Sequence, residues 1–400
     1  LTLGDVDVTN TATVAVHAVA FGAGSTTAGL NPALLGNVDD ALLNLMTIYD
    51  GGTLSSAQTS APFVWLFNSG GEAFDYLAAG QELVLTYLVE VADGRGGTDT
   101  QNVVVTITGT NDAPSVTAAS EGSDALTRTE TTQALVGSGT LSVADIDRAD
   151  QVNAAFVLAG AVQRDDEGTT MTSDPAQPSN PTLAGYFALT TANPVIGSLA
   201  QSGTIGWSFD TVGANPFAYL ARGETLTLTY TVTVTDSQGA TDTHDVTVTI
   251  TGSNQAPVVT PTDVAGAVVE DADPTALTDT GSFSFTDVDT SDRSTVGLTY
   301  VGATASGSAS VSTALNTALA SAVTLSGAGV PPGAAANAGT VTWDFGIANA
   351  LVQYLAAGEV VTATYTATVD DRNATTPQTI TVTITGGNDA PVITATPEQL

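Results

Sequence analysis

The chain contains stretches in which apolar side chains alternate with threonine. Residues 226–235 read Leu-Thr-Leu-Thr-Tyr-Thr-Val-Thr-Val-Thr, and residues 361–369 follow the same pattern. Shorter alternating runs stand at 103–107 and 246–250. A period of two places one kind of side chain on each face of an extended strand. The pattern therefore predicts half-buried antiparallel strands with threonine toward solvent.

Turn-forming residues separate these strands. Asp-Gly-Arg-Gly-Gly at 93–97 and Asp-Ser-Gln-Gly at 236–239 predict hairpins. Three apolar pairs upstream of the tryptophans predict one more core strand, namely Met46/Ile48, Phe187/Leu189 and Val323/Leu325. Several short strands with turns at regular spacing indicate an all-β fold made of β-sandwiches.

A few segments break the β pattern. Residues 31–35 and 39–43 predict a short helix, because Pro32 stands at an early position where a helix tolerates it. Residues 312–320 predict a helical turn, and the Gly- and Ala-rich stretch 327–339 predicts a surface loop.

The same anchor residues recur three times in the same order. They are an Asp-x-Asp, a tryptophan, a Tyr-Leu-Ala, a second tyrosine, an aspartate and a closing Asn-x-Ala-Pro. In that order, the residues of the three repeats are Asp5/Asp7, Asp145/Asp147 and Asp287/Asp289; Trp65, Trp207 and Trp343; Tyr76, Tyr219 and Tyr354; Tyr87, Tyr230 and Tyr365; Asp93, Asp236 and Asp371; and Asn111, Asn254 and Asn388. A repeat of roughly 140 residues can bury a core of its own. We therefore expect domains at 1–110, 111–253 and 254–387, the first without its first strand. Residues 388–400 are either the start of a next repeat or an exchanged strand.

The composition is strongly acidic. The chain has 41 acidic residues against 7 basic ones, all of them arginine, and a formal net charge of −34. Nucleic acid and anionic membranes both require a basic surface, so we expect neither as a partner. No apolar run approaches the length of about 20 residues that a membrane-spanning helix needs, so we expect no direct membrane insertion.

Cysteine is absent, which excludes disulfides and thiolate metal sites. An extracellular array without disulfides needs another stabilising element, and bound metal is the obvious candidate. No signal peptide opens the chain, and its first residues already belong to a repeat. We therefore expect a segment of a longer polypeptide.

Acidic residues gather near the joints between repeats. Asp145 and Asp147 lie two positions apart, so their carboxylates point to one side of an extended backbone. Asp236 can meet them, and Asn111 and Asp112 arrive from the preceding linker. Two carboxylates about 5 Å apart repel by about 0.8 kcal/mol in water and about 3 kcal/mol at an effective dielectric of about 20. Oxygen ligands without His or Cys suit Ca²⁺, which would turn this repulsion into attraction.

An Asp-x-Asp is also a common turn former, and a single copy indicates no more than that. Three copies, each at a joint, favour metal binding.

The chain resembles tandem VCBS repeats, the cadherin-like modules of very large RTX-type bacterial surface adhesins. The resemblance rests on Gly-Thr-Asn-Asp-Ala-Pro at 109–114, Thr-Asp-Val-Asp at 286–289, and Tyr-Leu-Ala-Ala-Gly-Glu at 354–359 leading to Thr-Tyr-Thr at 364–366. It covers nearly the whole chain. It implies tandem Greek-key β-sandwiches of cadherin or immunoglobulin type in an elongated array, located outside the cell at the bacterial surface, with Ca²⁺ at the linkers.

The resemblance also implies an early-strand glutamate and a mid-domain glutamate at each metal site. Glu130 and Glu270 match the first, and Glu224 and Glu359 match the second. The predicted metal ligands are Asp5, Asp7, Asp93, Asn111, Asp112, Glu130, Asp145, Asp147, Glu224, Asp236, Asn254, Glu270, Asp287, Asp289, Glu359, Asp371, Asn388 and Asp389.

Two positions depart from this pattern. The first repeat has Gln81, followed by Glu82, where the others have the mid-domain glutamate. The second joint has Gln255 in place of the linker aspartate, which predicts that it binds fewer ions, or binds them more weakly, than the first.

Other candidate motifs are weak. Asp165, Asp166 and Glu167 could mimic the pair of catalytic carboxylates of a hydrolase. They stand, however, in an insertion that the other two repeats do not share and that is typical of a solvated loop. His17 and His244 stand alone on Thr- and Val-rich strands, which favours surface or cross-strand roles.

These features predict a non-enzymatic spacer or stalk segment of a calcium-rigidified bacterial adhesin, with a role in cell adhesion and biofilm. Its partners would be neighbouring repeats of the same polypeptide. One alternative is a subunit of an extracellular filament, in which the last strand of one chain completes the first domain of an identical chain. A second is an accessory carbohydrate-binding module of a secreted enzyme, which needs an exposed aromatic platform. A third, adaptation to high salt, predicts acidic residues spread over all faces.

Overall fold

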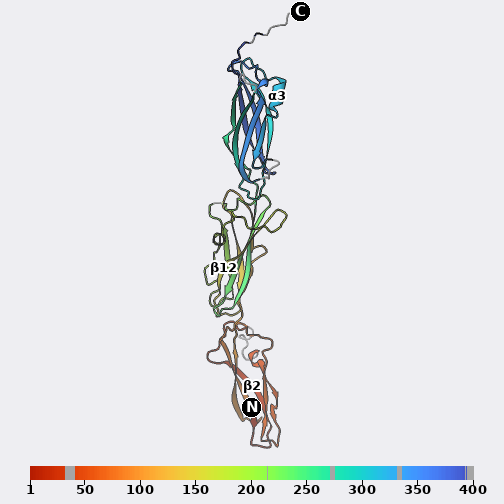
Figure 1. The fold of residues 1–400 in the computed structure, drawn as a ribbon. Helices are drawn as coiled ribbons and strands as arrows, with labels where there is room; N and C mark the ends of the chain where they lie inside the picture. The colour runs from red at the N-terminus through yellow and green to blue at the C-terminus, as the bar shows by residue number, and fades with distance from the viewer. Residues whose placement is uncertain (32–40, 214, 271–274, 331–335, 392, 394–400) are drawn as a thin grey trace, which may run out of the picture.

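Three β-rich units make up the protein. The computed structural model describes residues 1–31, 41–213, 215–270, 275–330, 336–391 and 393. The units lie end to end in sequence order, with the two termini toward opposite ends (Figure 1). Three separate clusters of buried apolar side chains form the cores. The elongated array of tandem sandwiches expected from the sequence is confirmed.

The second unit is a Greek-key sandwich of two four-stranded sheets. Its elements are β9 (Ser115–Ala118), β10 (Ala125–Thr129), β11 (Val136–Ala144), β12 (Asn153–Arg164), α2 (Asn180–Gly185), β13 (Phe187–Leu189), β14 (Ser202–Asp210), β15 (Thr225–Thr235) and β16 (Thr241–Thr251). The sheet orders are β10–β16–β15–β12 and β13–β14–β11–β9. Strand β9 is antiparallel to β11, whereas β10 runs parallel to β16. The first strand therefore crosses from one sheet to the other, and β10 covers the edge of β16.

The third unit repeats this topology. Its elements are β17 (Val258–Asp263), β18 (Ala265–Val269), β19 (Ala276–Thr286), β20 (Thr295–Ala305), α3 (Thr313–Leu319), β21 (Val323–Gly327), β22 (Ala338–Ala348), the 3-10 helix η3 (Asn349–Leu351), β23 (Val360–Asp370) and β24 (Thr375–Thr385). The sheet orders are β18–β24–β23–β20 and β17–β19–β22–β21. Again the first strand is divided, and β18 runs parallel to β24.

The first unit has no counterpart of this divided strand among its described residues. Its elements are β1 (Thr2–Gly4), β2 (Ala12–Phe21), the 3-10 helix η2 (Leu43–Leu45), β3 (Met46–Asp50), β4 (Thr53–Leu54), β5 (Ser60–Pro62), β6 (Val64–Phe67), β7 (Glu82–Ala92) and β8 (Thr98–Thr108). Strand β8 is the edge of the sheet β4–β2–β7–β8. Val105 and Ile107 on β8 are half-buried, whereas Val248 and Ile250 at the same positions of β16 are fully buried. The missing cover accounts for the difference.

Stacked aromatic side chains fill the middle of the second unit. Phe187 stacks on Tyr230 with ring centroids 4.3 Å apart and on Trp207 with centroids 5.7 Å apart. The Tyr230 hydroxyl donates to the Leu183 carbonyl at 2.7 Å, so burial leaves no phenol unpaired. Trp207 and Trp343 are buried in their cores, and Trp65 is half-buried against the core of the first unit.

A glycine makes room where the divided strand passes over the tryptophan. Trp207 donates from Nε1 to the Ser123 carbonyl at 2.9 Å. A Cβ atom on Gly139 would lie 2.2 Å from that carbonyl oxygen and 2.5 Å from the indole ring. Gly281 stands in the same relation to Trp343 in the third unit.

The short helices were predicted in part. Strands β3, β13 and β21 confirm the extra core strand, and α3 confirms the helical turn, with Ser312 Oγ capping it by accepting from Leu315 N at 3.1 Å. Helix α2 was not predicted. The helix expected in the first repeat falls largely on residues 32–40, outside the described residues.

Candidate metal centre at the joints

The linker of the first joint is held by carboxylates of the second unit. Asn111 Nδ2 donates to Asp236 Oδ2 at 2.9 Å, and the amide of Asp112 donates to Asp147 Oδ2 at 2.8 Å. A short polar segment thereby lies directly on the acidic end of the next unit.

The second joint repeats both contacts. Asn254 Nδ2 donates to Asp371 Oδ2 at 3.2 Å, and the amide of Gln255 donates to Asp289 Oδ2 at 2.8 Å. Because the amide and not the side chain makes the second contact, Gln255 preserves the geometry that the linker aspartate has at the first joint.

Local backbone turns orient the carboxylates of the second unit. Asp145 Oδ1 accepts from the amide of Asp147 at 3.0 Å, and Asp236 Oδ1 accepts from the amides of Gln238 and Ala240 at 2.9 and 2.8 Å. These turns form because an aspartate accepts readily from a backbone amide two residues on. Each carboxylate therefore uses one oxygen locally and keeps the other for the joint.

A third carboxylate completes each cluster. Asp150 follows a turn closed by its amide and the Asp147 carbonyl at 3.1 Å. Ligand atoms of Asp145, Asp150 and Asp236 all lie within 4.8 Å of one another. At the second joint the same holds for Asp287, Asp292 and Asp371.

Asp150 and Asp292 were missed by the sequence prediction. The signal was present, since each follows the second aspartate of an Asp-x-Asp by three residues, and Asn10 has this position in the first unit. The prediction covered only the Asp-x-Asp motif, because it did not include the turn that brings the third residue back to the cluster.

Buried oxygen atoms without a hydrogen-bond partner are concentrated at these two joints. At the first they are Asn111 Oδ1, Asp145 Oδ2, Asp147 Oδ1 and Asp150 Oδ2. At the second they are Asn254 Oδ1, Gln255 Oε1, Asp287 Oδ2, Asp289 Oδ1 and Asp292 Oδ2. Leaving so many buried acceptors unpaired is costly, and a cation ligated by oxygen removes the cost for all of them together.

Burial and mutual repulsion raise the pKa of these acids. Burial is the main cause for Asp147, whose pKa rises to about 6, with the neighbouring Asp145 adding to it. Burial likewise raises the pKa of Asp289 to about 7 and that of Asp292 to about 6. The unfavourable free energy of ionising these groups is what a cation would relieve.

The second joint also receives carboxylates from the preceding unit. Glu130, at the end of β10, accepts from Ser253 Oγ and Gln255 Nε2, both at 2.6 Å. The charge of Glu130 contributes to the raised pKa of Asp289, and that of Glu224 contributes to the raised pKa of Asp292. Carboxylates of both units therefore repel one another across this joint.

The mid-domain acids have a structural role as well. Glu224 and Glu359 each accept, through Oε2, the amide three residues earlier at 3.1 Å, which closes the Tyr-Leu-Ala turn. Gln81 does the same through Oε1 at 3.1 Å. Glu359 also accepts from the Ser308 hydroxyl, which is the main cause of its lowered pKa. This position is explained by the turn even without a metal.

The remaining predicted ligands lie at the two ends of the array. Glu270 accepts from the Gly387 amide at 2.7 Å, next to the exposed Asn388 and Asp389. At the other end Asp5 is half-buried and Asp7 is exposed. Asp93 Oδ1 accepts from the amides of Arg95 and Gly97 at 2.7 and 2.9 Å, and these bonds lower its pKa. The structure does not bring these two groups to any joint between described units.

The weaker motifs remain unremarkable. Asp165, Asp166 and Glu167 lie close together but are half-buried to exposed. His244 on β16 contacts Asp124, in the turn before β10, at 2.8 Å, and His17 lies 3.9 Å from Glu90. No helix among the described residues has the length and apolar character required to span a membrane.

Comparisons with known proteins add little beyond the fold. No family model and no curated protein matches the chain. Among solved structures it is similar to the extracellular cadherin domains 1–5 of protocadherin gamma B2 (13% identity, TM-score 0.40, 95% of this chain and 53% of that one). It is also similar to mouse protocadherin-24 EC1–3 (11%, 0.28, 96% and 92%) and to an endo-fucoidan hydrolase of glycoside hydrolase family 107 (11%, 0.20, 93% and 39%). The chain thus spans about half the length of the first of these. With TM-scores below 0.5 these similarities say nothing about its function, and the fold rests on its own strand pairing.

Proposed function

We propose that this chain is a calcium-rigidified spacer segment of an extracellular bacterial adhesin, without enzymatic activity, built of VCBS-type repeats. The observation that carries the proposal is the set of nine buried, unpaired oxygen atoms at the two joints. Every buried carboxylate among the described residues lies at an end of a unit, whereas adaptation to high salt alone would not bury them.

The residues that would hold Ca²⁺ fall into three groups at each joint. The linker supplies an asparagine and its neighbour, and the following unit supplies the three clustered aspartates and the second Asp-x-Asp residue. At the second joint the preceding unit adds Glu130 and Glu224. Bound calcium supplies positive charge shared by two units, so that separating or bending them exposes unpaired carboxylates. The consequence is a stiff rod that holds a distal domain away from the cell.

A carbohydrate-binding role has less support. Two of the three tryptophans are fully buried, and the strongly exposed Tyr49 and partly exposed Tyr354 belong to different units. They do not form the aromatic platform that such a role needs.

Calcium titration with and without chelator tests the proposal. We expect dissociation constants of about 10⁻⁴ to 10⁻³ M, the range of extracellular modules. Added calcium should raise the melting temperature, since a ligand that binds only the folded state stabilises it. It should also increase the radius of gyration measured by small-angle scattering. Identical melting and scattering curves in calcium and in chelator would refute the metal role.

A further inference from the structure

A pocket of about 390 Å³ lies beside the second joint. The second unit contributes Arg222, which follows the Tyr-Leu-Ala turn, and the third unit contributes Arg293 and Arg372. Three of the seven arginines of the chain therefore line one pocket. In a chain with a net charge of −34, such a concentration of positive charge requires an explanation.

The arginine side chains are not consumed by contacts within the protein. Arg222 Nη1 donates to Asn373 Oδ1 at 3.3 Å, which brings the two walls of the pocket together across the joint. Arg293 Nη1 donates to the carbonyls of Thr290 and Asp292 at 3.2 and 3.0 Å. No ion pair between an arginine and a carboxylate occurs in the described part of the chain. Because each guanidinium carries five N–H donors, donors remain for a ligand.

The aspartate cluster alone does not account for these arginines. The first joint has the same cluster of three aspartates. Its residues at the three corresponding positions carry no charge, namely Ala79, Gln151 and Ser237. The arginines therefore mark a difference between the two joints.

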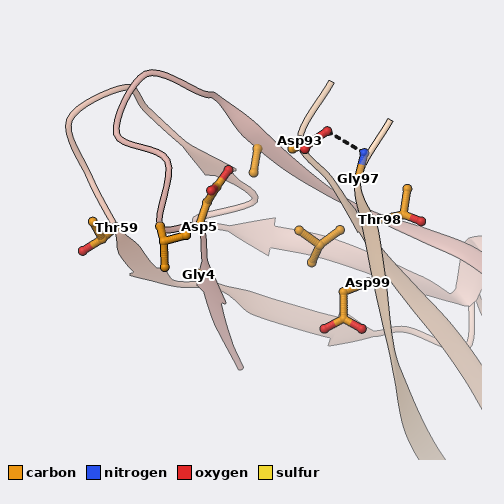
Figure 2. A pocket seen from close by; sticks show the side chains of 10 residues that line it. Gly4, Asp5, Thr59, Asp93, Gly97, Thr98 and Asp99 are labelled. Atoms are coloured by element: carbon orange, nitrogen blue, oxygen red, sulfur yellow. Dashed lines mark hydrogen bonds between the residues drawn. The ribbon is translucent and has the colours of Figure 1, made fainter. Parts of the chain in front are cut away.

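Arg372 also has a backbone conformation that favours glycine. Its φ is +79°, in the left-handed region. The hairpins at the same place in the other units use glycine there, Gly94 in the first and Gly239 in the second. Figure 2 shows the hairpin of the first unit, in which the Gly97 amide donates to Asp93. Backbone strain of this kind gathers at functional positions, which indicates a role for the Arg372 side chain.

Calcium decides the sign of the charge in this pocket. Asp165 and Asp166, from the insertion, also line it. So do Glu224, Asp292 and Asp371, which are among the residues proposed to hold calcium. Without a cation, the five carboxylates outnumber the three arginines. With calcium bound to the last three, the arginines outnumber the two carboxylates that remain.

We propose that this pocket binds an oxyanion of the size of sulfate when calcium occupies the second joint. Guanidinium groups suit this ligand, because their N–H donors match pairs of oxygen atoms on sulfate or carboxylate. Arg222 would hold the anion from the second unit, and Arg293 and Arg372 from the third. The inference rests on the proposed calcium role.

An anion at this place would couple to calcium. It would contact both units, so it would hold them together in addition to the metal. Coupling between two binding sites is reciprocal. Sulfate should therefore raise the calcium affinity of the second joint by the same factor by which calcium raises the sulfate affinity of the pocket.

Calorimetric titration of the 400-residue chain with sodium sulfate tests the inference, in calcium and in chelator at constant ionic strength. We expect saturable binding in calcium and binding at least about tenfold weaker in chelator. Arg372→Gln and Arg293→Gln should each weaken sulfate binding about tenfold, as expected for lost hydrogen bonds between charged groups. Arg95→Gln, which removes an exposed arginine from the hairpin of the first unit, is the matched control.

Dextran sulfate and uncharged dextran distinguish two sources of the anion. Free sulfate and the sulfate groups of an acidic polysaccharide present the same oxygen atoms. Displacement of bound sulfate by dextran sulfate, but not by dextran, would assign the pocket to polysaccharides. Sulfate binding that dextran sulfate does not displace would assign it to free anions. Both results support an oxyanion site.

The inference is overturned if sulfate does not bind the calcium-loaded chain, or binds equally in calcium and in chelator. It is also overturned if Arg372→Gln and Arg293→Gln, with unchanged melting temperatures, bind sulfate as tightly as the unsubstituted chain. Calcium binding without sulfate binding would leave the spacer proposal standing. A chain that binds no calcium would refute both.

Discussion

Individual carboxyl groups at the joints are buried, so ionising them without a bound cation costs free energy. Asp289 shows this most clearly. It is fully buried, one oxygen accepts the Gln255 amide, and the other has no partner. Burial and the charges of Asp287, Asp292 and Glu130 raise its pKa to about 7. The same side chain should therefore destabilise the metal-free protein and stabilise the calcium-bound one.

Asp289→Asn should separate these two effects. The amide keeps an oxygen for the Gln255 contact but removes one negative charge. In chelator we expect a gain of about 1 kcal/mol, a rise in melting temperature of about 3 °C. In calcium we expect affinity to fall about tenfold, or about 1.4 kcal/mol. Calorimetric titration and thermal melts measure both, and a change of the same sign in both buffers would contradict the role.

The pH dependence should also reverse with calcium. A carboxyl whose pKa is raised in the folded state contributes stability that is present below the unfolded pKa near 4 and is lost as pH rises through the folded value. For Asp147, Asp292 and Asp289 this loss begins near pH 4 and is complete at about pH 6 to 7. Chelated protein should therefore melt at a higher temperature at pH 5 than at pH 8.

Saturating calcium should give the opposite trend, because protons compete for the same oxygens. Thermal melts at several pH values in both buffers test the pair of trends. A chelated protein that becomes more stable as pH rises from 5 to 8 would be inconsistent with ionised, unpaired acids at the joints.

The candidate site could be predicted from sequence only where a motif repeats in a recognisable form. Asp145, Asp147 and Asp236 were found because their spacing recurs, and Asp150 was not, because a turn and not a strand carries it back to the cluster. The electrostatic roles of Glu130 and Glu224 depend on which end of a unit faces which neighbour. That arrangement follows from the topology of the sandwich and not from local pattern.

The individual strands were predicted closely by the alternation of apolar and polar residues, whereas the way the chain passes from one sheet to the other was not. Residues 225–235 alternate between buried and half-buried along their whole length, as the Leu/Thr pattern predicts. The division of the first strand between two sheets left no such signal, since β9 and β10 are short and separated by a turn. It is set by tertiary contacts, above all the passage over Trp207 that Gly139 permits.

The glycine that ends each last strand positions the linker. A Cβ atom on Gly252 would lie 2.2 Å from the Ala221 carbonyl oxygen and 2.4 Å from that of Leu220. The Gly252 amide also donates to the Glu224 carbonyl at 2.8 Å. A Cβ atom would likewise lie 2.1 Å from the Leu77 carbonyl oxygen at Gly109 and 2.5 Å from the Ala356 carbonyl oxygen at Gly386.

Gly252→Ala should displace the second linker from its turn. We expect a loss of about 1 to 3 kcal/mol, as for other substitutions that overpack a tight site. Calcium binding at the second joint should weaken as well, because Asn254 and Gln255 move with the linker. Gly297→Ala is the control, since nothing lies within 4 Å of a Cβ atom there. Equal effects of the two substitutions on stability and on calcium binding would show that the crowding is unimportant.

At the scale of the whole rod, the two joints differ in where their charge originates. At the first joint, the buried carboxylates all belong to the second unit, and Gln81 stands where the other units have glutamate. Arg148, next to Asp147, also reaches the first unit, since a Cβ atom on Gly29 would lie 2.8 Å from its Cδ. At the second joint, Glu130 and Glu224 add two buried carboxylates from the preceding unit. The substitution Gln255 lowers the linker charge there but leaves an unpaired amide oxygen facing inward.

We therefore expect the second joint to become rigid at lower calcium than the first, the reverse of the order that Gln255 alone suggests. The absence of cysteine allows clean labelling of exposed positions introduced in pairs, Thr100→Cys with Thr243→Cys across the first joint and Thr243→Cys with Thr379→Cys across the second. The width of the distance distribution between spin labels, followed over a calcium titration, reports the stiffness of each joint. Because Glu130 and Glu224 are the source of the asymmetry, Glu130→Gln together with Glu224→Gln should bring the second joint to the calcium requirement of the first. If, in the unsubstituted chain, the distance distribution across the first joint narrows at lower calcium than the distribution across the second, then the linker residue outweighs the glutamates and this order is wrong.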